Sequence, residues 1–174
     1  TEPEITEPES LPTEPETEPT EPEPVQTEPQ PTISIDEIAE HWFEDTLFIG
    51  NSLVSGLQIC SELQEPDYFC DVGMTVFNYS SKTLSDKNFS NMTLQQLLAS
   101  RTYDKIFFNF GLNEAGYSAS YFISKYQALV DFVKAAQPDA ILILNGIMSV
   151  TPSKASQASY FTPAYLASLS AKIE

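Results

Sequence analysis

Two stretches of the sequence contain the residue types that serine-dependent acyl transfer needs. Residues 50–53 read Gly-Asn-Ser-Leu after a short apolar run, and residues 111–114 read Gly-Leu-Asn-Glu after another. A serine hydroxyl between a strand and a helix can attack an ester carbonyl, because the helix N-terminus presents backbone N–H groups and a favourable dipole to the developing oxyanion. The side-chain amide of Asn113 can donate a further hydrogen bond to that oxyanion. By itself, Ser52 also fits the simpler role of a helix cap.

Gly73 is a third candidate for this chemistry. It follows the stretch Phe-Cys-Asp-Val and offers a backbone N–H with no Cβ to obstruct an acyl group. Glycine between β-type residues also marks bulges, so this position alone is not specific. The fourth apolar run ends in Asn145 and Gly146, again a polar residue beside a glycine.

The elements that would position these residues alternate along the chain. Apolar runs predict strands at residues 46–50, 68–79, 104–111 and 140–146. Helical spacing of apolar residues predicts helices over 34–45, 52–63, 93–100, 118–137 and 162–173. This alternation indicates an α/β fold with a parallel sheet covered by helices on both faces. Ligands of such sheets bind at the carboxyl ends of the strands, where the candidate residues are expected.

Taken in order, these residues resemble the first three sequence blocks of the SGNH (GDSL-type) hydrolases. The resemblance runs from about residue 45 onward and rests on 50–53 with Gly56, on Gly73, and on 111–114. It implies a flavodoxin-like three-layer α/β/α fold, with four of five expected strands present, and esterase or acyl-hydrolase activity without metal or cofactor. It implies Ser52 as nucleophile, and an oxyanion hole made by the Ser52 and Gly73 N–H groups and the Asn113 side chain. The predicted substrate-binding residues are Asn51, Gly111, Glu114 and Asn145. For Glu114 an exposed acid at a helix start is expected, and ordering of the Asn113 loop is the alternative.

The sequence departs from that family in two places. Asn51 stands where the family usually has Asp, which keeps the size of the side chain and removes its charge. The family's C-terminal Asp/His block has no counterpart, and the one histidine, His41, is expected in a structural role before the first strand. A fifth strand and the Asp/His block are therefore expected after Glu174. The 174-residue fragment is expected to be inactive or nearly so, because loss of a triad member costs on the order of 10³–10⁶ in rate.

Composition divides the chain into a linker at 1–32 and a domain at 33–174. The linker holds ten Glu, nine Pro and seven Thr, with no Lys, Arg, Gly or aromatic residue, and is predicted to be disordered and extended. It carries −10 of the formal net charge of −17. The domain is also acidic and lacks Lys/Arg clusters, which disfavours nucleic acid and anionic membranes as partners. No apolar run reaches the ~18 residues of a membrane span. A Thr/Glu/Pro spacer suggests an extracellular or cell-surface protein, of Gram-positive type by its resemblance.

Several alternatives remain open from the sequence. Cys60 and Cys70 could pair if the fold brings them together, or stay as buried thiols. A non-catalytic carbohydrate-binding or adhesive module is the chief rival to an esterase, favoured by Asn51 and the missing histidine. A nucleotide or flavin binder is disfavoured, since no glycine-rich phosphate loop occurs. The expected substrate is a small-molecule or polysaccharide ester, and the oligomeric state is unknown. The polar loop 148–157 is the candidate for substrate selection, and aromatic residues that can rim the site or pack in the core are Tyr117, Tyr121, Phe122 and Tyr160.

Overall fold

The computed structural model describes residues 41–173. The linker predicted at 1–32, and with it the domain boundary, lies outside these residues. Four parallel strands form a sheet in the order β2-β1-β5-β6. Their bounds are β1 Thr46–Gly50, β2 Asp67–Cys70, β5 Lys105–Asn109 and β6 Ile141–Leu144. In register, Gly50 at the end of β1 pairs with Cys70 on one side and Asn109 on the other. The carboxyl ends of three neighbouring strands therefore lie side by side. This end of the sheet is called the carboxyl edge below, and the opposite end the amino edge.

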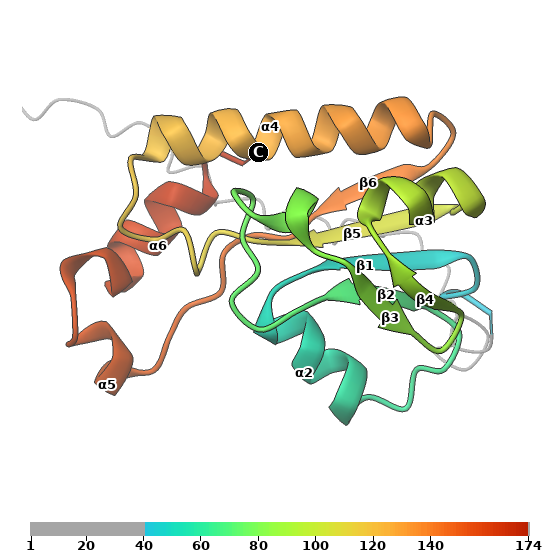
Figure 1. Ribbon diagram of the computed structural model, residues 1–174. Helices are drawn as coiled ribbons and strands as arrows, with labels where there is room; N and C mark the ends of the chain where they lie inside the picture. Colours follow the sequence, from blue (N-terminus) through green and yellow to red (C-terminus); the bar gives the residue numbers. More distant parts are fainter. Residues whose placement is uncertain (1–40, 174) are drawn as a thin grey trace, which may run out of the picture. The chain divides into compact units, whose positions relative to one another are not determined.

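Helices cover both faces of this sheet, as Figure 1 shows. Helices α3 (Leu94–Ser100) and α4 (Ala119–Ala136) lie on one face and α2 (Ser52–Cys60) on the other. The alternation of side chains along β1 explains the two layers, because Leu47 and Ile49 enter the larger core while Phe48 packs on the α2 side. The predicted α/β architecture with four parallel strands and three layers is confirmed.

The part of the chain that follows β6 lies beyond the carboxyl ends of the strands. Helices α5 (Pro152–Ala155) and α6 (Pro163–Ser170) are at the left of Figure 1, where β6 ends. Thr151 and Thr162 cap them, and in each case the hydroxyl accepts a backbone N–H three residues on. The loop predicted at 148–157 thus contains one short helix, and the 3₁₀ turn Ser159–Phe161 follows it.

The second predicted strand is wrong in length. β2 ends at Cys70, and the chain then turns at Asp71–Met74 and forms a 3₁₀ turn at Tyr79–Ser81. A hairpin of β3 (Leu84–Asp86) and β4 (Phe89–Met92), which was not predicted, comes next. Its Asp86 carboxylate accepts the Tyr68 N–H at 2.8 Å, so the hairpin protects the otherwise open edge of β2.

Two smaller expectations also need correction. Residues 41–45 of the helix predicted at 34–45 form a turn, and the rest of that prediction lies outside the described residues. Cys60 is exposed rather than buried and Cys70 is half-buried, and both are free thiols.

Candidate active site

Three loops bring the predicted catalytic residues to the same edge of the sheet. Ser52 comes two residues after Gly50, Gly73 three residues after Cys70, and Asn113 four residues after Asn109. Because those strand ends are paired neighbours, the three residues follow adjacent strands. The loops also touch directly, since the Asn113 Nδ2 donates a hydrogen bond to the carbonyl oxygen of Met74 at 3.1 Å.

Ser52 is exposed at the first position of α2 and does not cap the helix. Asn51 is the cap, and its Oδ1 accepts the Leu53 N–H at 3.0 Å. The alternative of Ser52 as helix cap is therefore wrong. Within residues 41–173 the Ser52 hydroxyl makes no hydrogen bond, so it is free for chemistry at the N-terminal end of a nine-residue helix.

Asn51 itself lies beneath the surface. The residue is 1 % exposed, and its Nδ2 has no hydrogen-bond partner among the described residues. In this position Asn51 caps the helix and shapes the turn before Ser52, and its contact with substrate stays a prediction. Nothing in the sequence indicates which of Asn51 and Ser52 is buried, because either side chain can cap a helix.

Gly73 occupies a tight turn that its glycine makes possible. The Met74 N–H donates to the Asp71 carbonyl at 3.0 Å, and Gly73 has a φ of +77°. A Cβ at this position would meet no atom within 4 Å, so the glycine is required by backbone conformation and not by crowding. Gly73 is exposed, and its N–H forms no hydrogen bond within the described part of the chain.

Glu114 is fully buried and connects the loops that carry Gly73 and Asn113. Its Oε1 accepts the Val76 N–H at 2.8 Å and its Oε2 accepts the Gly111 N–H at 2.7 Å. Burial raises the pKa of the Glu114 carboxyl, and the two N–H donors oppose that rise. The expectation of an exposed Glu114 is wrong, because the residue is 0 % exposed and orders the loops, as the alternative had it. Its contact with substrate stays a prediction.

The two other predicted substrate-binding residues differ in position. Gly111 is buried with a φ of +111°, and its N–H is taken by Glu114. Its contact with substrate stays a prediction. Asn145 is half-buried, and its backbone N–H donates to the Phe108 carbonyl at 3.0 Å.

Asn145 borders a groove of about 480 Å³ on the α2 side of the sheet. The groove is lined mostly by apolar side chains of β1 and α2, with two amides from the ends of β5 and β6. Its residues are Phe48, Leu53, Val54, Gly56, Leu57, Cys60, Asn109, Asn145 and Met148.

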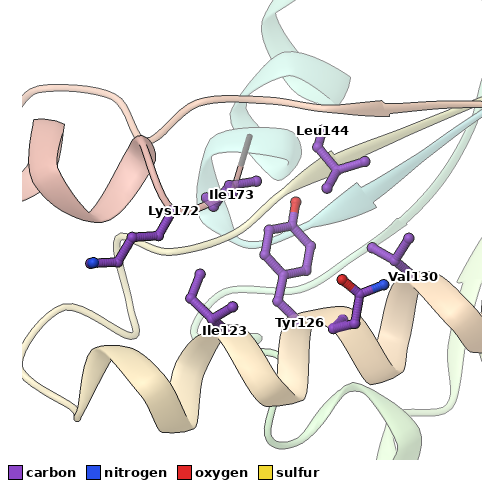
Figure 2. A pocket seen from close by; sticks show the side chains of 7 residues that line it. Ile123, Tyr126, Val130, Leu144, Lys172 and Ile173 are labelled. Atoms are coloured by element: carbon purple, nitrogen blue, oxygen red, sulfur yellow. The ribbon is translucent and has the colours of Figure 1, made fainter.

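A smaller cavity of about 30 Å³ lies on the opposite face of the sheet, between α4 and the end of β6. Figure 2 shows that Tyr126 points from α4 toward Leu144, with Ile173 beside it. The Tyr126 hydroxyl is buried with no partner among the described residues, and burial raises its pKa. The cavity can hold one water molecule. None of the predicted catalytic residues lines it.

His41 is far from the candidate nucleophile. Its side chain is 74 % exposed, and its Nδ1 lies 2.6 Å from the Glu44 carboxylate at the amino end of β1. The five residues of β1 separate it from the site by roughly 13 Å of strand. Within residues 41–173 no histidine lies at the carboxyl edge, and no group of three or more potential metal ligands occurs. None of the described helices is long and apolar enough to cross a membrane.

Comparison with known proteins gives structural matches. No protein-family model and no curated relative matches the sequence. A Streptococcus pneumoniae protein described as a candidate platelet activating factor superimposes with a TM-score of 0.55 at 19% identity, over 72% of this chain and 57% of that one. A candidate acylhydrolase from Bacteroides fragilis superimposes with a TM-score of 0.52 at 15% identity, over 74% of this chain and 60% of that one. A candidate SGNH hydrolase from Slackia heliotrinireducens superimposes with a TM-score of 0.51 at 15% identity, over 74% of this chain and 72% of that one.

The chain thus spans less than two thirds of the length of the first two of these structures. Sequence identities of 15% to 19% indicate a shared fold and do not indicate a shared substrate. The described residues have the fold of the SGNH hydrolases and acylhydrolases.

Proposed function

We propose that this chain is the larger part of an SGNH-type serine ester hydrolase, which cleaves esters through an acyl-enzyme on Ser52. The observation that carries the proposal is the common edge on which an exposed serine hydroxyl, an exposed glycine and a side-chain amide follow three adjacent strands. The candidate acylhydrolase and the candidate SGNH hydrolase with the same fold support the reaction class.

In this mechanism Ser52 Oγ attacks the ester carbonyl, and the carbonyl oxygen becomes an oxyanion. The N–H groups of Ser52 and Gly73 and the Asn113 amide stabilise that oxyanion. The Asn113 amide has two N–H bonds, and the contact with the Met74 carbonyl uses one of them. The second remains for the oxyanion, while the first fixes the orientation of the amide. The alcohol then leaves, and water releases the acyl group from Ser52.

The proton of Ser52 needs a base that this site does not hold within residues 41–173. His41 is at the wrong edge, and the sequence has no other histidine. We propose that the full-length protein supplies an Asp/His pair from a segment outside this chain. The 174-residue chain by itself would then react slower than the full-length protein by a factor on the order of 10³ or more.

A carbohydrate-binding module without catalytic activity is the second candidate. The absence of a histidine from the carboxyl edge within residues 41–173 favours it, because binding without catalysis needs no base for the Ser52 hydroxyl. This module would keep the fold and the loops at the carboxyl edge.

Covalent labelling distinguishes the two candidates. The full-length protein is treated with a fluorophosphonate probe, and the modified residue is identified by mass spectrometry. An ester hydrolase is labelled on Ser52, and Ser52→Ala abolishes the labelling. Ser55→Ala is the matched control, because Ser55 lies one turn further along α2 and its hydroxyl points back to the Asn51 carbonyl. Labelling that is absent, or that persists in Ser52→Ala, would reject the esterase.

A further inference from the structure

Three aromatic rings form an exposed cluster, here called the aromatic platform, which consists of Phe77, Tyr117 and Tyr121. The Phe77 ring stacks on Tyr121 with centroids 5.0 Å apart and an interplanar angle of 12°, and lies 4.9 Å from the Tyr117 ring. Tyr117 is 55 % exposed and Tyr121 is 48 % exposed. Two exposed rings that lie against a shared third ring form a contiguous aromatic surface, which makes the cluster a candidate binding surface.

The platform belongs to the same loops as the oxyanion donors. Phe77 lies four residues after Gly73, on the segment whose Met74 carbonyl receives the Asn113 amide. The Tyr117 N–H donates to the Glu114 carbonyl at 3.0 Å, so Tyr117 closes the turn that begins at Asn113. Tyr121 is in the first turn of α4, which starts at the carboxyl edge of the sheet (Figure 1). The platform is therefore continuous with the candidate site.

The faces of the three rings are not equally available. Tyr121 is covered on one face by Phe77, and the Lys125 Nζ lies 5.7 Å from its ring centroid. Phe77 is half-buried between the two tyrosines. Tyr117 contacts Phe77 at a tilt of 52° and has the largest exposed fraction of the three. A planar or ring-shaped ligand would stack on Tyr117, with Tyr121 at its edge.

We infer that the aromatic platform binds a neutral sugar ring, the alcohol part of the ester. A pyranose presents C–H bonds from its ring face, which suit the negative face of an aromatic ring, and hydroxyls from its edge, which suit tyrosine hydroxyls. A flat, open surface does not enclose an acyl chain, which needs a concave apolar pocket. The acidic domain disfavours phosphorylated or otherwise anionic ligands. The inference rests on the proposed function for the role of the sugar, but the binding itself does not require catalysis.

The test measures equilibrium binding of unesterified cellotetraose, xylotetraose and chitotetraose to the full chain by isothermal titration calorimetry. At least one of these neutral oligosaccharides should bind. Tyr117→Phe keeps the ring and should bind within about twofold of the wild type, whereas Tyr117→Leu keeps apolar volume without the π face and should bind roughly 2- to 12-fold more weakly. Trp42→Leu is the control, because Trp42 is an exposed ring at the amino end of β1.

Several outcomes would overturn the inference. One is that none of the three oligosaccharides binds at millimolar concentration. Another is that Tyr117→Leu and Tyr117→Phe bind with equal affinity. The third is that Trp42→Leu loses as much affinity as Tyr117→Leu. Failure of the proposed function has a different signature, namely no labelling of Ser52 by the fluorophosphonate. If the protein binds sugar through Tyr117 and is not labelled on Ser52, the inference about the aromatic platform stands and the proposed esterase activity is rejected.

Discussion

At the scale of single residues, the Glu114 carboxylate holds together two loops that the backbone alone does not connect. Val76 is separated from it by 38 residues, and both carboxylate oxygens accept buried N–H groups. The sequence predicts Asn113 and Gly73 in the site, since a polar residue after an apolar strand is a local signal. It does not predict that Glu114 is buried, because one of its two donors, the Val76 N–H, comes from a distant segment and no local sequence pattern indicates that contact.

Glu114→Ala should destabilise the protein by about 2–6 kcal/mol. The substitution leaves the Val76 and Gly111 N–H groups buried without acceptors, at a cost of about 1–3 kcal/mol each. Urea denaturation measures the loss. The control is Glu62→Ala at an exposed position, which should stay within about 0.5 kcal/mol of the wild type. A Glu114→Ala effect as small as this control would show that the two hydrogen bonds do not order the loops.

The contribution of Glu114 should also depend on pH. Its pKa is raised in the folded state, so its stabilising effect is fully present below the unfolded pKa of about 4.3 and is lost as the pH rises through the folded value. The unfolding free energy of the wild type minus that of Glu114→Gln, measured by urea denaturation from pH 4 to 7.5, should therefore fall as the pH rises. A difference that grows with pH would mean that the two N–H donors outweigh burial and lower the pKa.

At the scale of elements, the strands β1, β5 and β6 are predictable because each contains a continuous apolar run. Burial is complete along β1 only, while β5 alternates between buried and half-buried residues and β6 begins at the exposed Ile141. The end of β2 is not predictable by the same signal. The residues after it are β-branched and aromatic, yet the Thr75 and Val76 N–H groups donate to the Asn78 and Glu114 side chains instead of to a strand. Tertiary hydrogen bonds therefore override the local preference for β structure.

Two glycines, one in the loop after β5 and one inside α2, are expected to respond in opposite ways to substitution by alanine. A Cβ at Gly111 would lie 2.5 Å from the Ile147 Cδ1, and its φ of +111° disfavours any side chain. Gly111→Ala should therefore cost about 1–3 kcal/mol or more. Gly56 is inside α2, where a Cβ would meet no atom within 4 Å, so Gly56→Ala should stabilise by about 0.5–1 kcal/mol. Thermal unfolding of both variants tests these two expectations. A stabilising effect of Gly111→Ala would contradict the constraint that its positive φ and its closeness to Ile147 impose.

At the scale of the whole molecule, the candidate site and a stabilising hydrogen-bond network lie at opposite ends of the sheet. The carboxyl edge carries Ser52, Gly73 and Asn113, whereas the amino edge carries a buried polar network around Asp67. The Asp67 carboxylate accepts the Tyr103 hydroxyl and the Asn88 amide, each at 2.7 Å, and pairs with the Arg101 Nε at 3.2 Å. This network joins β2, the hairpin and the end of α3.

Substitutions at the two edges should separate stability from chemistry. Asp67→Ala leaves the buried Tyr103 hydroxyl without its acceptor and should cost about 1–3 kcal/mol, with Ser52 labelling of the folded protein unchanged. Asn113→Ala should lower the labelling rate about 10²–10³-fold while its unfolding free energy changes by less than about 1 kcal/mol. Labelling rates and urea denaturation are measured on both variants. A labelling defect in Asp67→Ala at full folding, or none in Asn113→Ala, would contradict this separation.

A crystal structure of the full-length protein after reaction with diethyl p-nitrophenyl phosphate tests the shared edge most directly. We predict a covalent bond from Ser52 Oγ to phosphorus, with the phosphoryl oxygen about 3 Å from both the Gly73 nitrogen and the Asn113 Nδ2. Phosphorus on a different residue, or a phosphoryl oxygen on Ser52 that contacts neither donor, would contradict the convergence of these three residues on one carbonyl.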